Sequence, residues 1–459
     1  MEELNQIVQN TSDFVWNFLL IFLLIGTGIF YTVKLKFIQV KKFKEGYTRV
    51  VKGVNLNGEA AGSDGMSSFQ SLATAVAAQV GTGNLAGAAT AIAAGGPGAI
   101  FWMWMSAFFG MATVYSEAVL GQLFKKKIDG EVIGGPAFYI SEGLGKNKIS
   151  KFLAGFFGVS CILALSFMGN AVQSNSIAAA FSNEFPVNPL YVGIGIAIIS
   201  GFIFWGGTKR IASFTEKVVP VMAALYVGTS LLIVFMNITH IFPAIKMIFV
   251  GAFNPTAVIG GVFGITIKQA VRFGVARGLF SNEAGMGSTP HAHAVAKVNH
   301  PCEQGAVAVI TVFIDTFIVL TCTALVIIMK VDLTNKALVD SIPGIALTQE
   351  AFKLALGHFG GIFIAICLFF FALSTIIGWY YFGVANIKYL FGAKALNIYK
   401  IIVILFILLG SFAKVELVWN LSDLFNGLMA FPNLIALLVL YKLVVKATNE
   451  YSEGDFLEK

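Results

Sequence analysis

Six consecutive residues, from Gln79 to Asn84, place two glycines, two amides and a hydroxyl in the middle of a long apolar run, residues 69–92. They read Gln-Val-Gly-Thr-Gly-Asn. Backbone freed from helical hydrogen bonding at membrane depth is tolerated only where protein or a watery cavity satisfies it. The pattern therefore predicts an interrupted helix that binds something other than lipid. Close packing against another helix is the alternative explanation for Gly81 and Gly83.

A second apolar segment, residues 260–285, carries several glycines and four charges, on Lys268, Arg272, Arg277 and Glu283. Four charges cannot all face lipid, so this segment must be partly unwound, line a cavity or pair its charges. We expect the unwinding at Phe273, Gly274 and Ala276. A structural role is favoured for Arg277 and Glu283.

Other polar side chains lie deep in apolar runs: Asn170 and Gln173, the pair Ser374-Thr375, and Asp315. An intramembrane carboxylate binds a cation, carries a proton or pairs with a base. For Asp315 we favour pairing with Arg272 or Lys268. The other side chains either bind a ligand or make hydrogen bonds between helices, and Ser and Thr can also bond to carbonyls one turn earlier in their own helix.

Composition identifies a polytopic membrane protein. Of the 459 residues 57% are hydrophobic and only 12% are charged, against about 25% charged in soluble domains. We expect eleven membrane spans: 14–33, 67–92, 97–123, 152–182, 188–207, 215–238, 258–285, 303–329, 359–386, 397–412 and 417–445. The basic residues behind the net charge of +7 lie mostly in the loops between spans, so the charge does not indicate nucleic-acid binding.

The distribution of basic residues predicts the orientation. In this layout, 23 of the 31 Lys and Arg residues lie on one side of the membrane. The positive-inside rule then places the N-terminus outside and the C-terminus in the cytoplasm.

Without the first span, ten spans remain, and they divide into two sets of five. An odd number of spans in each half forces the halves into opposite orientations, and each half opens with an interrupted segment, as in transporters built from inverted repeats. We therefore predict three regions: 1–66, an extra N-terminal transmembrane helix and linker; 67–446, a ten-helix core with inverted repeats 67–238 and 258–446; and 447–459, a cytoplasmic tail.

Two motifs resemble a known family. Gly95-Gly96-Pro97-Gly98-Ala99-Ile100-Phe101-Trp102-Met103-Trp104, followed by Gly110, and Arg277-Gly278-Leu279-Phe280-Ser281-Asn282-Glu283-Ala284-Gly285, are similar to motifs of the alanine/glycine:cation symporters. That family belongs to the amino acid–polyamine–cation superfamily, and the residues 81–85 resemble the first-helix break of the bacterial leucine transporter. The resemblance covers nearly the whole chain. It implies an all-α, leucine-transporter-like 5+5 inverted repeat in the plasma membrane, and sodium-driven uptake of small neutral amino acids such as alanine and glycine.

An amino acid zwitterion needs donors for its carboxylate and acceptors for its ammonium group. A half-helix N-terminus supplies free N–H groups, and glycine lets a ligand approach the backbone closely. We therefore expect these residues to bind the substrate: Gln79, Gly81, Thr82, Gly83, Phe167, Asn170, Phe273, Gly274, Ala276 and Trp379. The resemblance implies the roles of Phe167 and Asn170 in the fourth span. Packing explains Trp379 equally well.

The resemblance also implies ion sites. Ser374 and Thr375 look like the pair that holds one sodium in the leucine-transporter fold, with backbone carbonyls of Ala77, Val80 and Phe371. Asn84 matches a side-chain ligand of a second sodium site. Glu117 resembles a glutamate that accepts N–H groups from the unwound second-half helix, a structural role.

Other function classes lack support in the sequence. No P-loop and no nucleophile with an adjacent base occurs, so an ATP-driven pump and an enzyme are disfavoured, and no cofactor other than co-transported sodium is expected. A sodium-independent or proton-coupled carrier of the same fold, with Asp315 taking the proton, remains the main rival, and a channel is a further one.

Overall fold

Seven helices among the described residues are long and apolar enough to cross a bilayer. The computed structural model describes residues 2–54, 65–254, 266–342 and 344–453. The long helices are Gly98–Leu123, Lys148–Glu184, Gly207–Met236, Pro301–Lys330, His358–Phe391, Ala393–Gly410 and Glu416–Ser452, and three shorter apolar helices are Ile21–Lys34, Pro189–Trp205 and Ile238–Phe253. The protein is therefore a multi-pass membrane protein built from α-helices.

The first part of the bundle, up to residue 253, alternates long helices with short π-helical segments, η1, η2 and η3. In chain order its elements are α1 (Glu2–Phe14), η1 (Val15–Leu20), α2 (Ile21–Lys34), α3 (Ile38–Lys41), α4 (Phe43–Val54), α5 (Ser68–Gln79), η2 (Gly83–Gly87), α6 (Ala88–Gly95), α7 (Gly98–Leu123), α8 (Pro136–Gly143), α9 (Lys148–Cys161), η3 (Ile162–Gly169), α10 (Asn170–Glu184), α11 (Pro189–Trp205), α12 (Gly207–Met236), the 3-10 turn η4 (Ile238–His240) and α13 (Ile241–Phe253).

The second part begins with the shortened helix α15 and ends with the longest helix, α23. Its elements are α15 (Ile267–Asn282), α16 (Pro290–Ala294), α17 (Pro301–Val312), the π-helical η5 (Phe313–Leu320), α18 (Thr321–Lys330), α19 (Lys336–Ser341), α20 (Ile345–Leu356), α21 (His358–Phe391), the 3-10 turn η6 (Ala393–Ala395), α22 (Leu396–Gly410) and α23 (Val415–Glu453).

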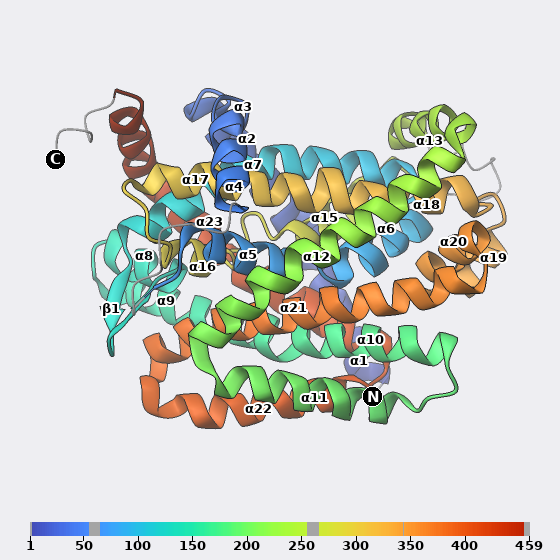
Figure 1. Cartoon of the computed structure of the whole chain (residues 1–459). Helices are drawn as coiled ribbons and strands as arrows, with labels where there is room; N and C mark the ends of the chain where they lie inside the picture. Colours follow the sequence, from blue (N-terminus) through green and yellow to red (C-terminus); the bar gives the residue numbers. More distant parts are fainter. Residues whose placement is uncertain (1, 55–64, 255–265, 343, 454–459) are drawn as a thin grey trace.

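One small sheet interrupts the helical pattern. Strands β1 (Lys126–Ile128) and β2 (Glu131–Ile133) form an antiparallel hairpin. Asp129 and Gly130 connect them with positive φ angles of 52° and 83°, as an Asp-Gly hairpin turn requires. The hairpin lies at the end of the bundle opposite α13, α19 and α20 (Figure 1), and we call these two ends the hairpin end and the α20 end.

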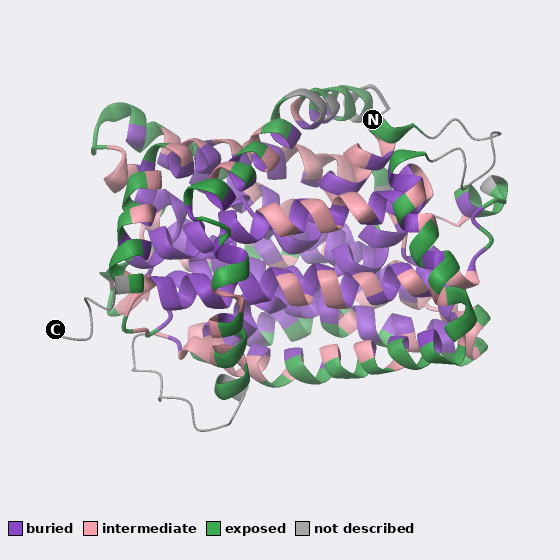
Figure 2. Ribbon diagram, turned by 90° about the horizontal axis from the view of Figure 1, so that it is seen from above, coloured by how far each residue is buried: buried purple, intermediate pink, exposed green. Residues whose placement is uncertain are grey.

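Buried residues fill the centre of the bundle, and exposed residues lie on its outer helices (Figure 2). The outer surface is apolar: Phe202 is 68% exposed, Phe242 84% and Ile398 65%. Large apolar side chains at such exposure indicate a surface that contacts lipid. The interior is unusually polar for a membrane protein, and the candidate site lies there.

Candidate functional site at two interrupted helices

The first interruption lies where the sequence predicts it. Helix α5 ends at Gln79, and the chain resumes as η2 at Gly83. The backbone N–H of Gly81 donates to Asn84 Oδ1 over 3.0 Å, and that of Thr82 donates to Gln173 Oε1 over 3.2 Å. Polar side chains therefore satisfy the freed donors, as backbone in a membrane interior requires.

The second interruption lies later than predicted. Helix α15 is continuous from Ile267 to Asn282, and residues 283–289 connect it to α16. The backbone turns left-handed at Glu283, Gly285 and Gly287, with φ of 58°, 87° and 82°. A break at Phe273, Gly274 and Ala276 is therefore wrong.

Close packing explains the glycine that misled this prediction. A Cβ on Gly274 would collide with the carbonyl oxygen of Ala99 in α7, and it would lie 2.7 Å from Trp102 Cβ. Gly274 thus allows two helices to approach closely. Residues 255–265, at the start of the predicted span 258–285, lie outside the described residues.

Glu117 of α7 accepts hydrogen bonds from backbone N–H groups of the unwound segment. Its two oxygens accept the N–H groups of Gly285 and Gly287 over 3.1 and 2.9 Å. The side chain of Asn433 in α23 donates to Glu117 over 2.6 Å and to the carbonyl of Gly285 over 2.9 Å. This geometry matches the structural role expected for Glu117, and Asn433 is a partner that the sequence did not indicate.

The two interruptions touch each other. A Cβ on Gly83 would lie 2.7 Å from Ser281 Cα, so glycine is needed for the two backbones to approach. Gln79 Nε2 donates to the carbonyl oxygen of Asn282 over 2.7 Å. Segments about 200 residues apart in the chain therefore share one buried contact.

Several buried polar atoms beside this contact have no hydrogen-bond partner in the described part of the chain. They are Gln79 Oε1, Thr82 Oγ1, both amide atoms of Asn170 and Ser174 Oγ. Asn170 and Ser174 are one turn apart on α10, beside Gln173, which bonds to Thr82. Leaving such atoms unpaired costs about 1–3 kcal/mol each, so a polar ligand that bonds to them would gain stabilisation.

Trp379 of α21 forms one wall of this region. A Cβ on Gly169, next to Asn170, would lie 2.5 Å from its ring. The indole N–H of Trp379 donates to the Glu283 carboxylate, whose other oxygen accepts the hydroxyl of Ser288. Neutral donors thus satisfy Glu283, and they fix the Trp379 ring against the unwound segment.

Phe167 lies elsewhere. Its ring stacks on Phe406 of α22 with centroids 4.7 Å apart, on the side of the helix that α22 covers. The resemblance implied that it lies beside Asn170 in the binding site, which holds only if a regular α-helix connects the two residues. Residues 162–169 are π-helical, and the wider turn changes which residues share a face.

Five oxygen atoms meet where the sodium site is expected. Thr375 Oγ1 lies 2.9 Å from the carbonyl oxygen of Ala77, 3.4 Å from that of Val80 and 3.0 Å from that of Phe371. Ser374 Oγ lies 3.3 Å from Ala77 O and 2.8 Å from Phe371 O. The hydroxyls therefore bond within their own helix and also reach α5. An oxygen-rich set of this kind suits a hard cation.

Asp315 lies beside the first interruption with neutral partners. Its carboxylate accepts Asn84 Nδ2 at 2.7 Å, Ser281 Oγ at 3.0 and 3.1 Å, and Thr316 Oγ1 at 2.8 Å. Pairing with Arg272 or Lys268 is therefore wrong as a prediction, since Lys268 is exposed and the Arg272 guanidinium lies 5.1 Å from the Phe273 ring centroid. Arg277, for which a structural role is favoured, pairs with Asp423 of α23 at 2.9 and 2.7 Å.

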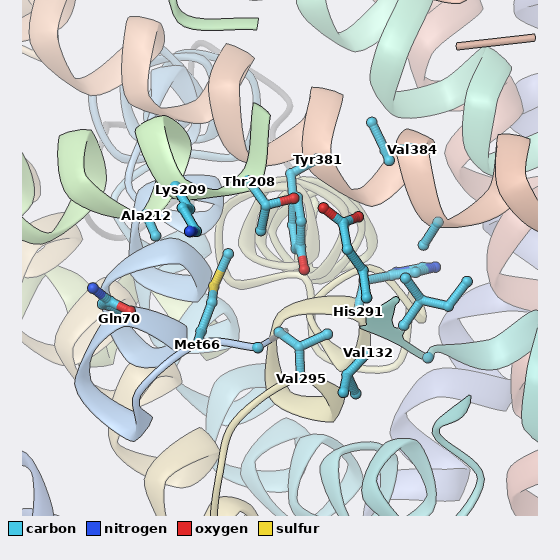
Figure 3. A pocket seen from close by; sticks show the side chains of 15 residues that line it. Met66, Gln70, Val132, Thr208, Lys209, Ala212, His291, Val295, Tyr381 and Val384 are labelled. Atoms are coloured by element: carbon cyan, nitrogen blue, oxygen red, sulfur yellow. The ribbon is translucent and has the colours of Figure 1, made fainter. Parts of the chain in front are cut away.

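Two cavities approach the site from opposite ends of the bundle. The larger, of about 920 Å³, lies at the α20 end, and its lining includes Asn175, Arg277 and Trp419. The smaller, of about 360 Å³, lies at the hairpin end, where Met66 and Tyr381 reach into it from opposite walls (Figure 3). His291 of α16 lines the smaller cavity, three residues beyond Ser288. Neither lining includes the unpartnered atoms of Gln79 or Asn170.

Comparison with known proteins identifies the family. A family model described as the sodium:alanine symporter family matches residues 1–457. The chain belongs to this family. The description of the family and the names of its members indicate a transporter.

Three curated relatives illustrate the similarity. The sodium/alanine symporter AgcS of Methanococcus maripaludis is 43% identical over 448 residues, which are 97% of each chain. Two Bacillus subtilis proteins are 40% identical over 450 residues, 98% of this chain: the amino-acid carrier protein AlsT, with 92% of its length covered, and the probable sodium/glutamine symporter GlnT, with 91% covered.

Proposed function

We propose that the protein carries small neutral amino acids, alanine and glycine among them, into the cell together with sodium. The observation that carries this proposal is the contact between two interrupted helices, bordered by the unpartnered side-chain atoms of Gln79, Thr82, Asn170 and Ser174. The family match and the names of the relatives agree with it.

The substrate binds between the interruptions in this proposal. The backbone at Gly81–Gly83, where helix η2 begins, receives the carboxylate, because a helix N-terminus carries a partial positive charge. The N–H groups of Gly81 and Thr82 then exchange their side-chain acceptors, Asn84 and Gln173, for the ligand. Gln79 Oε1 and the side-chain oxygen of Asn170 accept from the ammonium group. Residues 282–287 replace Phe273, Gly274 and Ala276 as the second wall, and Phe167 is left out.

The position of the Trp379 ring limits the size of the substrate. Its ring is held between Gly169 and the Glu283 carboxylate, so it cannot swing away without losing a buried hydrogen bond. A short side chain then fits better than a long one.

Sodium binds in this proposal to the carbonyl oxygens of Ala77, Val80 and Phe371 and to the hydroxyls of Ser374 and Thr375. The ion would tie α5 to α21, while the substrate touches both interruptions. Coupling arises because each ligand favours the same closed arrangement, and neither alone supplies all the contacts. Asn84 lies beside Asp315, and the two would hold a second sodium.

The topology that we propose has eleven spans, with the N-terminus outside and the C-terminus in the cytoplasm. An extra first helix precedes the core 67–446, which consists of inverted repeats 67–238 and 258–446, and the tail 447–459 follows. One observation supports the repeat: α5 and α15, the interrupted helices, both begin with a capping box, Ser67–Gln70 and Thr266–Gln269. In this orientation the α20 end faces outward.

A proton-coupled carrier is the second candidate, because Asp315 is fully buried among neutral donors. A carboxylate in that setting can take up a proton instead of a metal ion. Asp315 would then exchange its proton with each transport cycle.

Binding of radiolabelled alanine to the purified protein tests the proposal. We expect saturable binding in sodium that is lost when choline replaces sodium at constant ionic strength. Undiminished binding in choline that rises with acidity would favour the proton-coupled candidate. No saturable alanine or glycine binding under any of these conditions would overturn the assignment of substrate.

A further inference from the structure

An ion pair joins Arg277, which lines the larger cavity, to Asp423. Arg277 lines that cavity with Trp419, and its guanidinium lies 4.9 Å from the Trp419 ring centroid. The ion pair is mostly buried, with side-chain exposures of 12% and 18%. Such a pair joins α15 to α23 at the boundary between the cavity and the interior.

A series of edge-on and tilted aromatic contacts continues from this ion pair to the binding region. Phe280 lies 5.0 Å from Trp419 and 5.9 Å from Trp379, measured between ring centroids. Trp379 in turn donates to Glu283 in the unwound segment. Arg277 and Trp419 thus line the α20-end cavity, and Phe280 connects Trp419 to Trp379 at the site. We call Arg277, Asp423, Trp419 and Phe280 the outer layer.

The N-terminal helix contacts this layer directly. The indole N–H of Trp16, in η1, donates to the backbone carbonyl of Asp423 over 3.0 Å. The same residue of α23 thus bonds to Trp16 through its backbone and to Arg277 through its carboxylate. Close packing supports the contact, since a Cβ on Gly427 would lie 2.8 Å from Leu20 and 3.0 Å from Val15.

The local structure around Trp16 is also unusual. Residues Val15–Leu20 are π-helical within an otherwise α-helical segment. A π-helical turn inserts an extra residue and redirects side chains, and such turns are frequent at functional sites. Here the turn carries Trp16 itself, which is only 6% exposed although the segment lies at the edge of the bundle.

We propose that the N-terminal helix controls the opening of the outer layer, with Trp16 as a positioning residue that holds the Asp423 carboxylate on Arg277. This inference rests on the proposed function, because it assigns the layer to a transport cycle. Opening toward the α20 end requires α15 and α23 to separate. The Trp16 bond fixes the α23 side of that contact, so it slows the escape of a bound amino acid.

The test is the release rate of radiolabelled alanine from purified protein loaded in sodium. Trp16→Phe keeps the ring and removes the donor, and Asp423→Asn weakens the ion pair itself. We expect each variant to release alanine faster, Trp16→Phe by about fivefold, the factor carried by one neutral hydrogen bond. The double variant should be no faster than Asp423→Asn alone, because both changes act on the same contact.

Trp205→Phe serves as the matched control, since that ring is 60% exposed on the outer surface. A wild-type release rate in Trp16→Phe would overturn the inference. So would additive effects in the double variant together with a lowered thermal midpoint, because they would assign Trp16 a general structural role. Absence of alanine binding in the wild-type protein would instead refute the proposed function.

Discussion

At the scale of single residues, Asn170 offers the sharpest test of the binding site. Its amide has no partner in the described structure, so Asn170→Ala removes no protein hydrogen bond. We expect alanine affinity to fall about 10-fold to 100-fold, as for a hydrogen bond to a charged group, with little change in thermal stability. Equilibrium binding and thermal unfolding of the same preparation measure both.

Asn175 on the same helix provides the contrast. Its amide donates to the carbonyl oxygens of Gly410 and Ala413 over 2.8 and 3.0 Å. Asn175→Ala should therefore lower the thermal stability more than Asn170→Ala does, and it should lower the alanine affinity less. A larger loss of alanine affinity in Asn175→Ala than in Asn170→Ala would contradict our placement of the substrate beside Asn170.

Thr375 tests the sodium site at the same scale. Thr375→Ala removes a hydroxyl that lies within 3.4 Å of three carbonyl oxygens. We expect the sodium concentration for half-maximal alanine binding to rise about 10-fold or more, because an ion loses one ligand. Thr311→Ala is the control, since that buried hydroxyl bonds only to Ala308 within its own helix. An equal shift in both variants would contradict the assignment.

Only part of this site could be proposed from the sequence. The Ser374-Thr375 pair was singled out by its resemblance to the leucine-transporter fold, and its role as a sodium site stays a prediction. The partners of Asp315 were not identifiable, because Asn84 lies 231 positions away and Ser281 lies on another helix. The orientation of Phe167 was missed because the sequence gives no clear signal for the π-helical turn before it.

At the scale of elements, the first interruption was predictable and the second was misplaced. Both contain glycines, but glycine has two uses in a membrane helix: it breaks the helix, or it lets another helix approach. At Gly274 the neighbouring backbone of α7 explains the residue, and only at Gly285 and Gly287 does a positive φ require it. Pro290, which begins α16, was the signal that marked the end of the unwound segment.

Helix α4 contacts α23 through an ionisable side chain, Glu45, and this contact depends on pH. Glu45 accepts hydrogen bonds from Tyr451 of α23 and from Lys42, and it pairs with Arg49. Burial would raise the pKa of Glu45, but the bonds from Tyr451 and Lys42 outweigh it, so the pKa lies below its usual range. The carboxylate therefore stabilises the fold at neutral pH, and this contribution is lost as the pH falls from about 4.3 through the lowered value.

Glu45→Gln should consequently destabilise the protein at pH 7 by about 0.5–1 kcal/mol, since the pair is partly exposed. The difference from wild type should shrink at pH 4, and thermal unfolding at both pH values measures it. Glu450→Gln is the control, because that carboxylate is 48% exposed and lies 3.7 Å from Lys446. A loss in Glu45→Gln that is the same at both pH values would contradict the role of its charge.

At the scale of the whole molecule, coupled transport makes accumulation depend on membrane voltage. One sodium ion that crosses 100 mV gains about 2.3 kcal/mol, and each tenfold ratio of solute costs about 1.4 kcal/mol. We therefore expect a potential of 100 mV to raise the final alanine ratio about 50-fold for a one-to-one stoichiometry. Uptake into proteoliposomes with a clamped potassium diffusion potential measures this, and a ratio independent of voltage would contradict sodium coupling.

The cavity at the α20 end has one more consequence. Its volume of about 920 Å³ far exceeds the space that an alanine molecule fills, and Arg277 and Trp419 of the outer layer line it. A bulky amphiphilic compound could lodge there without advancing, since apolar rings and charged groups line the same wall. Such a compound would inhibit transport without being transported. Its potency would depend on the fraction of time for which the α20-end cavity is open.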